Sequence, residues 1–285
     1  MTRPLLFVMA LMAAAGSLLA QVPAFSSKVE AVRVDVLVTE NGRPVRGLQA
    51  GDFDVLDNGV PQPVDLVSYE DIPLNVILAF DMSESLDQTS LDHLRNAGKT
   101  LLDGLNRDDR AALVTFSHVV AQRAPLTSDF DRVRAALDDA APSGHTSLVD
   151  ASFAAMMIGE SDVGRSLVIV FSDGVDTTSW LSAESVLETA RRCDAVVYGV
   201  EVGKSRSGFS RELTSATGGR LMEIQSTRDL NATFRAILDE FRQRYLISYS
   251  PKGVAGAGWH RLEVRVKGRN AAVKSRPGYL AAGPG

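Results

Sequence analysis

The pattern of hydrophobic and polar positions changes twice along the chain. From residue 29 to residue 69, apolar side chains alternate with polar ones, as in the run 32–38, and Asn41-Gly42 and Asn58-Gly59 give strong turn signals. From Tyr245 onward a similar alternation returns. Period-two alternation predicts half-buried strands, and no helix of useful length fits either flank.

The segment between the flanks has a different pattern. Runs of apolar residues, each long enough for one strand, alternate with amphipathic helical stretches. These runs are 75–80, 111–116, 166–171 and 195–200. Ser128, Ser182 and Thr227 stand where helix N-caps are expected. We therefore predict an α/β fold with a Rossmann-like, doubly wound, mostly parallel sheet covered by helices on both faces.

Neither flank holds enough strands to be stable alone. We expect the two flanks to pack together as a small second β unit beside the α/β domain. The predicted division is a signal peptide at 1–20, an N-terminal β segment at 21–72, the α/β domain at 73–242 and a C-terminal β segment at 243–285.

The first 20 residues resemble an export signal. Arg3 precedes an apolar run from Leu5 to Ala20, which is shorter than the ~20 residues that span a bilayer comfortably, and small residues gather at its end. We expect cleavage after Ala20, with Ala24 as a second possible site and an uncleaved anchor as the alternative. The expected location is therefore secreted or periplasmic, with no membrane span in the mature chain.

Composition narrows the function classes. The net charge of −5 argues against a nucleic-acid binder, and 45% hydrophobic residues are typical of a globular chain. One cysteine excludes a disulfide framework and a cysteine-rich zinc site. Four scattered histidines make a histidine-rich metal centre improbable.

Oxygen-bearing side chains gather at two predicted strand ends and one loop between them. Asp81, Ser83 and Ser85 follow the first apolar strand with period-two spacing, and Asp173 follows the strand 166–171. Thr146 lies just before a nearly apolar helix, where we expect it to be exposed. Parallel sheets place ligands at the carboxyl ends of their strands, so these five residues are the candidate metal ligands.

The chemistry of this set favours a hard divalent cation. Two carboxylates and three hydroxyls suit Mg²⁺, with Mn²⁺ or Ca²⁺ possible, and suit zinc or copper poorly. Nearby, Glu84 is expected to point outward, and Asp176 to lie in a solvated loop. For Asp150 we leave open whether it orients a ligand or is a solvated helix charge.

The DxSxS of Asp81, Ser83 and Ser85, the Thr146 loop and the FSDG around Asp173 resemble the metal-ion-dependent adhesion site of von Willebrand factor type A domains. The resemblance covers residues 73–242. It implies that the five residues bind the metal directly or through water, and that a partner protein's Asp or Glu completes the coordination. The segments 47–55 and 276–279 are similar to a secreted bacterial subfamily. This chain differs from the family pattern at His145, where the family usually has a second glycine before the threonine.

We therefore expect a metal-dependent protein-interaction module and not an enzyme. No GxSxG elbow, Walker loop or strand-borne GxGxxG is present. One alternative is a structural protein of an envelope assembly whose metal site is not essential. Another is a metal-dependent phosphatase of the haloacid-dehalogenase type, which needs a carboxylate where this chain has Ser83.

Overall fold

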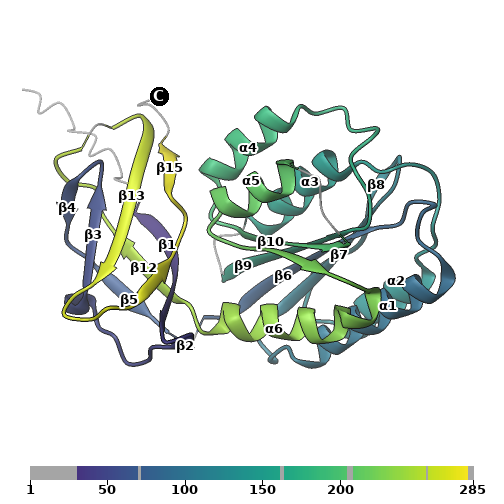
Figure 1. The fold of residues 1–285 in the computed structure, drawn as a ribbon, viewed down its shortest axis with the longest axis horizontal. Helices are drawn as coiled ribbons and strands as arrows, with labels where there is room; N and C mark the ends of the chain where they lie inside the picture. Colours follow the sequence, from purple (N-terminus) through teal and green to yellow (C-terminus); the bar gives the residue numbers. More distant parts are fainter. Residues whose placement is uncertain (1–30, 70–71, 161–163, 204–207, 255, 282–285) are drawn as a thin grey trace, which may run out of the picture.

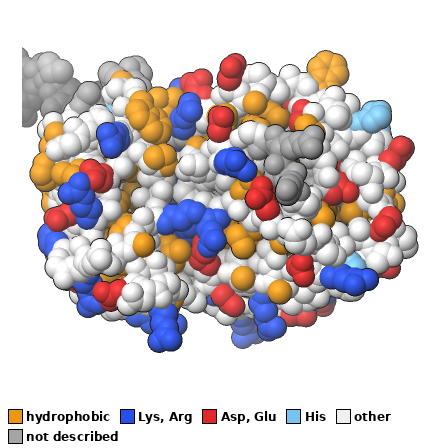
Figure 2. Space-filling model, viewed as in Figure 1, with side chains coloured by type: hydrophobic (Ala, Val, Ile, Leu, Met, Phe, Trp, Pro, Cys, Tyr) orange, Lys and Arg blue, Asp and Glu red, His pale blue; other side chains and the backbone are white. Residues whose placement is uncertain are grey.

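Two units lie side by side in the computed structural model, which describes residues 31–69, 72–160, 164–203, 208–254 and 256–281. Figure 1 shows an α/β unit beside a β unit built from both flanks. Figure 2 shows one face of the molecule, on which basic, acidic and apolar side chains are interspersed. The predicted signal peptide lies outside the described residues. Within them, no helix is long and apolar enough to cross a membrane.

The α/β unit is organised around a six-stranded sheet with the order β11-β10-β9-β6-β7-β8. All neighbouring pairs are parallel except β7 with β8. The strands are β6 (Leu74–Asp81), β7 (Arg110–Phe116), β8 (Val120–Thr127), β9 (Arg165–Ser172), β10 (Val196–Val202) and β11 (Leu221–Ile224). Every residue of β6 and β9 is buried, as the continuous apolar runs predict for strands covered on both faces.

Helices of the described part of the chain cover both faces of this sheet (Figure 1). One layer contains α1 (Gln88–Asp103), α2 (Phe130–Asp139) and α6 (Leu230–Arg242), and the other contains α3 (Leu148–Gly159), α4 (Ala183–Arg192) and α5 (Gly208–Ala216). Odd and even residues of β6 supply the two separate cores. The predicted α/β, doubly wound fold is confirmed.

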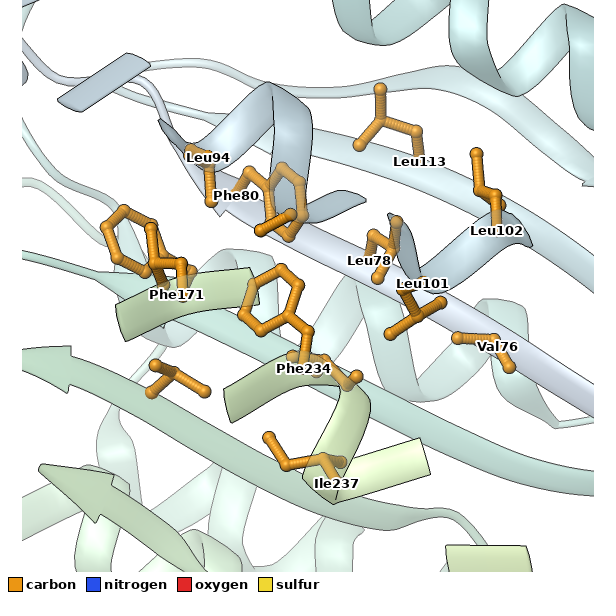
Figure 3. Close-up of a cluster of buried hydrophobic side chains, with 14 of the residues drawn as sticks. Val76, Leu78, Phe80, Leu94, Leu101, Leu102, Leu113, Phe171, Phe234 and Ile237 are labelled. Carbon is orange, nitrogen blue, oxygen red and sulfur yellow. The ribbon is translucent and has the colours of Figure 1, made fainter. Parts of the chain in front are cut away.

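Figure 3 shows the core on the α1–α6 side. The Phe80 ring from β6 lies 5.6 Å from the ring of Phe234 on α6, and 6.5 Å from that of Phe171 on β9 in an edge-to-face arrangement. Leu94 and Leu101 of α1 belong to the same core, with Leu94 beside Phe80 and Leu101 beside Leu78 (Figure 3). This packing fixes the ends of β6 and β9 relative to each other.

Two helix starts differ from the prediction. Asp129, not Ser128, caps α2, because its carboxylate accepts a hydrogen bond from Arg132 N. Thr227 lies inside a short 3₁₀ helix, η2 (Thr227–Asp229), which Ser226 caps before α6 begins. In both cases adjacent Ser, Thr and Asp residues are all good caps, so the sequence alone does not choose between them.

The flanks form the second β unit. One sheet has the order β14-β1-β12-β5 with β2 added to β1, and the other has the order β15-β13-β3-β4. The elements are β1 (Val32–Glu40), β2 (Arg43–Pro44), η1 (Ala50–Asp52), β3 (Phe53–Asp57), β4 (Val60–Gln62), β5 (Leu66–Ser68), β12 (Tyr245–Tyr249), β13 (Gly258–Val266), β14 (Ala272–Lys274) and β15 (Gly278–Ala281). The two sheets share one apolar core.

Pairing between the flanks is direct, which confirms that they form one β unit. In one sheet Val34 of β1 lies opposite Ile247 of β12, and in the other Val55 of β3 lies opposite Val264 of β13. Both pairs are antiparallel. Each sheet therefore needs strands from both flanks.

A buried polar cluster lies in this β unit. The Asp57 carboxylate, fully buried, accepts hydrogen bonds from Tyr249 Oη at 2.8 Å and Tyr279 Oη at 2.9 Å, and lies 2.7 Å from His260 Nδ1. Burial raises the pKa of both tyrosines, and the hydrogen bonds to Asp57 raise it further. The tyrosines therefore remain neutral donors. The cluster joins β3, β12, β13 and β15 and so holds both sheets together.

Two buried arginines form ion pairs between the β unit and the α/β unit. Arg165 at the start of β9 binds the Asp35 carboxylate of β1, and its guanidinium lies 4.8 Å from the centre of the Phe241 ring. Arg276 lies 3.3 Å from the Asp194 carboxylate. Alternation along β1 predicts that Asp35 lies on the polar face, but it is only 9% exposed because Arg165 pairs with it there.

Truncation tests the mutual dependence of the flanks. Deleting every residue from Tyr245 onward removes the strands that pair with β1, β3 and β5. We expect limited proteolysis, read by mass spectrometry, to cut the truncated protein within residues 32–69 while the full chain is protected there. Equal protection in both proteins would contradict the prediction.

Candidate metal centre

The candidate centre lies at the carboxyl edge of the central sheet. Asp81 is the last residue of β6 and Ser172 the last of β9. These strands are paired in parallel with Phe80 opposite Phe171, so their last side chains are neighbours. The loop before α3 brings Thr146 to the same edge, because its backbone bonds to the segment that follows β9.

Four of the five candidate ligands form one chain of hydrogen bonds. Asp81 Oδ1 accepts from Ser83 N at 2.9 Å, and Ser83 Oγ lies 2.9 Å from Ser85 Oγ. Ser85 Oγ in turn donates to Asp173 Oδ1 at 2.8 Å. Ser172, which no sequence pattern singled out, donates its hydroxyl to Asp81 Oδ2 at 2.7 Å. Both carboxylate oxygens of Asp81 are therefore fixed in direction.

The fifth residue, Thr146, is buried, contrary to the expected exposure: only 6% of it is accessible. Its carbonyl accepts from Thr177 N at 2.9 Å and Thr178 N at 3.2 Å, so the loop after β9 folds over it. A Cβ placed on Gly174 would lie 3.4 Å from Thr146 Oγ1, which puts the hydroxyl beside the Asp173 loop. Among the described residues its hydroxyl has no recorded hydrogen bond, so this oxygen is free to bind a ligand.

Electrostatics at the centre favour a cation. Asp81 is 1% exposed, and burial raises the pKa of its carboxyl from 3.8 to about 6; the nearby Asp173 charge adds to the rise, while the hydrogen bonds from Ser172 and Ser83 oppose it. A buried carboxylate beside a second carboxylate is costly without a positive charge. Within the described residues, no three His, Cys, Asp or Glu side chains converge as a metal site. Hydroxyls must therefore complete any ligand set here.

Contacts around the centre explain which position in the loop before Thr146 has to be glycine. Glu84 is exposed as expected, but its Oε1 also accepts from Gly144 N at 3.2 Å, and its own N donates to Gly144 O. Gly144 has a φ of +67°, and a Cβ there would lie 2.0 Å from His118 Nδ1. Gly144 is thus the position in this loop where a side chain does not fit. His145, which replaces the usual second glycine, is exposed and meets no such restriction.

Asp150 and Asp176 hold the loop after β9 against α3. Asp150 accepts hydrogen bonds from Trp180 N and Leu181 N, each at 2.9 Å, and so is neither a free helix charge nor directed at a ligand. Asp176 accepts from Val149 N at 3.2 Å and is not simply solvated. No spacing rule connects these residues, which lie in different elements, so neither role has a signal in the sequence.

Comparison with solved structures shows the same fold in other proteins. Proximal thread matrix protein 1 from the mussel byssus superimposes with a TM-score of 0.53 at 16% identity, covering 64% of this chain and 49% of that chain. Another structure of that protein, described as having a zinc-occupied MIDAS motif, gives 0.53 at 17%, covering 64% and 48%. At these identities the likeness shows the fold alone.

Comparison of sequences identifies the family of the chain. Inter-alpha-trypsin inhibitor heavy chain H2 of Mus musculus is 26% identical over 210 residues, which cover 67% of this chain. The chain spans only 22% of that relative's length. The family model of the von Willebrand factor type A domain matches residues 75–236, more than half of the chain. The matched region includes β6 from its second residue onward, all of β9 and all five candidate ligands, and the chain therefore belongs to the von Willebrand factor type A domain family.

Proposed function

We propose that the chain binds a divalent cation through Asp81, Ser83, Ser85, Thr146 and Asp173. The observation that supports this best is the hydrogen-bond chain from Asp81 to Asp173, built around a buried carboxylate. When bound, the cation supplies positive charge and an open position for a carboxylate from outside the chain.

Mg²⁺ is the proposed metal. The donors are all oxygen, and three of them are neutral hydroxyls, which suits a hard cation that keeps some of its waters. Mn²⁺ and Ca²⁺ have compatible donor preferences. Zinc, which the related mussel structure is described as holding, prefers nitrogen and sulfur donors, and neither occurs among these five residues.

The proposed partner is a protein that offers an Asp or Glu side chain to the metal. The loop after β9 supports this because it forms a fixed rim with apolar side chains directed outward. Trp180 is 95% exposed and Val175 58%, while Asp150 and Asp176 hold their loop in place. Exposed aromatic side chains on a fixed backbone are typical binding anchors.

A binding role fits the site better than catalysis. Ser83 occupies the position where a haloacid-dehalogenase phosphatase needs a second carboxylate, and it bonds to Asp81 and Ser85 instead. The alternative of a structural envelope protein with a non-essential metal site is separated from the favoured role by the test below. Secretion or a periplasmic location, with cleavage after Ala20, remains part of this proposal.

A capture experiment tests the metal-bridged mechanism. We expect the chain to retain an envelope protein in Mg²⁺, to release it in EDTA, and to lose it when Thr146 becomes Val, which keeps the shape but removes the hydroxyl. Thr146→Ser keeps the hydroxyl and should retain the partner. Circular dichroism checks that both variants fold. A complex that survives EDTA and tolerates Thr146→Val would support the structural alternative.

A further inference from the structure

A cavity of about 420 Å³ lies where the two units meet, away from the metal centre. Its wall includes Thr214 and Ser215 of α5, Arg220 just before β11, and Lys274 at the end of β14. The metal centre is at the carboxyl edge of the parallel sheet, whereas this cavity lies near the amino end of β10, since a Cβ on Gly219 would meet Val197 O. The two sites are therefore at opposite edges.

Glycine allows the two units to approach each other here. Gly218 has a φ of +77°, and a Cβ on it would lie 2.5 Å from Arg276 N. The segment after β14 therefore passes directly over the turn between α5 and β11. One wall of the cavity belongs to the α/β unit and the other to the β unit, so a bound molecule would contact both.

Positive charge exceeds negative charge around the cavity. Arg211, Arg220 and Lys274 line it, with Glu223 as the lining carboxylate. Arg211 lies 3.4 Å from Glu223, and Arg220 lies 2.7 Å from Glu240. Figure 2 shows Lys and Arg side chains gathered near the middle of the face, where the units meet.

A fourth cation lies behind the wall. Arg244 is fully buried, and its Nη2 contacts Tyr198 Oη at 2.9 Å and the already paired Glu240 at 3.6 Å. Within the described residues its Nε and Nη1 have no hydrogen-bond partner. Four cations thus face two carboxylates, an excess of two charges. The nearby carboxyl end of α5 offsets only about half a charge.

Lys274, unlike the three arginines, has no recorded ion-pair partner within the described residues, although the Glu240 carboxylate acts on it from a distance. It is half-buried, and among the described residues no ion pair or hydrogen bond is recorded for its ammonium. Burial, together with the charges of Arg244 and Arg220, lowers the pKa of Lys274 from 10.5 to about 8, and the Glu240 carboxylate opposes this shift. An ammonium placed in this way gains from a nearby anion, whose charge offsets both the desolvation and the repulsion.

We propose that this cavity binds a small molecule with two negative charges, such as phosphate or a short dicarboxylate, held by Lys274, Arg220 and Arg211. Two negative charges match the excess of two positive ones, and the volume is within the range of small-ligand sites. Because Lys274 is on β14 and Arg220 precedes β11, the bound anion joins the two units.

Calorimetry and thermal unfolding of the full chain test the proposal, with inorganic phosphate and succinate as probes and chloride at equal ionic strength as the reference. The protein is first freed of metal with EDTA and then dialysed into metal-free buffer without EDTA, so that phosphate cannot bind through a metal at the other site and EDTA does not compete for the cavity. We expect saturable binding of at least one probe and a rise in melting temperature that chloride does not produce. Which probe binds identifies the anionic group.

The variants locate the site. Lys274→Gln should weaken binding by at least about tenfold, the effect of losing one charged contact, and Arg220→Gln should do the same if the first variant folds poorly. Lys252→Gln removes an equal charge from an exposed loop of the same flank and should change nothing. Equal affinity in wild type and both cavity variants, or no saturable binding of either probe, would overturn the proposal.

Discussion

Replacing Asp81 by Asn is expected to abolish divalent-cation binding and yet to make the metal-free protein more stable at pH 7. The amide can keep both hydrogen bonds, because its oxygen accepts from Ser83 N and its NH₂ group can donate to Ser172 Oγ. What disappears is the negative charge. That charge attracts a metal. When no metal is bound, however, the charge destabilises the folded protein, because it is buried beside the charge of Asp173.

The sign of the stability change follows from the pKa. Burial raises the pKa of the Asp81 carboxyl to about 6, so the folded protein holds the proton more tightly than the unfolded chain. Stability from this group is therefore present at low pH and is lost as the pH rises from about 4 to about 6. At pH 7 the full penalty applies, so the neutral Asn should recover about 1 to 3 kcal/mol.

Calorimetry with Mg²⁺ and Mn²⁺, and urea unfolding with and without metal, measure both effects. The wild type should show one site and gain stability with metal, and Asp81→Asn should show neither. Glu84→Gln is the matched control, since it removes an equal charge at the exposed rim and keeps an oxygen for Gly144 N. Metal binding that persists in Asp81→Asn would place the metal elsewhere.

Replacing Arg165 by Met should lower the free energy of unfolding by about 3 to 5 kcal/mol, the cost of leaving a buried charge unpaired. Asp35 is 9% exposed, and Arg165 is its partner across the two units. The loss arises from the uncompensated Asp35 carboxylate more than from the missing attraction. Urea unfolding followed by circular dichroism measures it.

The double variant separates these causes. With Asp35→Leu added to Arg165→Met, no unpaired charge remains, and stability should return to within about 1 kcal/mol of the wild type. Arg134→Met breaks a solvent-exposed pair with Asp103 and should cost less than about 1 kcal/mol. A double variant as unstable as Arg165→Met alone would show that the lost packing of Arg165 on Phe241 is the cause.

The sequence predicts the α/β unit well because its strands are buried on both faces. The run 76–80 within β6 is apolar for this reason, and the position of Asp81 directly after it follows from where this run ends. Period-two spacing then brings Ser83 and Ser85 to the same edge. These are local rules, and they lead to the candidate ligands without any knowledge of distant contacts.

The features that the sequence did not reveal depend on distant contacts. Asp35 is buried by a residue 130 positions away, and Thr146 is covered by a loop 31 positions later. The run at 276–279 also depends on distant contacts: Arg276 binds the carbonyl of Arg191, and a Cβ on Gly278 would lie 2.2 Å from His260 O. Such pairings have no signature in local spacing.

Strand pairing between the flanks also determines how the chain carries mechanical load. The α/β unit is inserted between β5 and β12, and both ends of the described chain belong to the β unit. Tension applied at residues 31 and 281 therefore passes through the strand contacts of the β unit and bypasses the sheet that holds the candidate metal centre. A protein tethered at those two ends could bear force there while the geometry of Asp81 and Asp173 stays undisturbed.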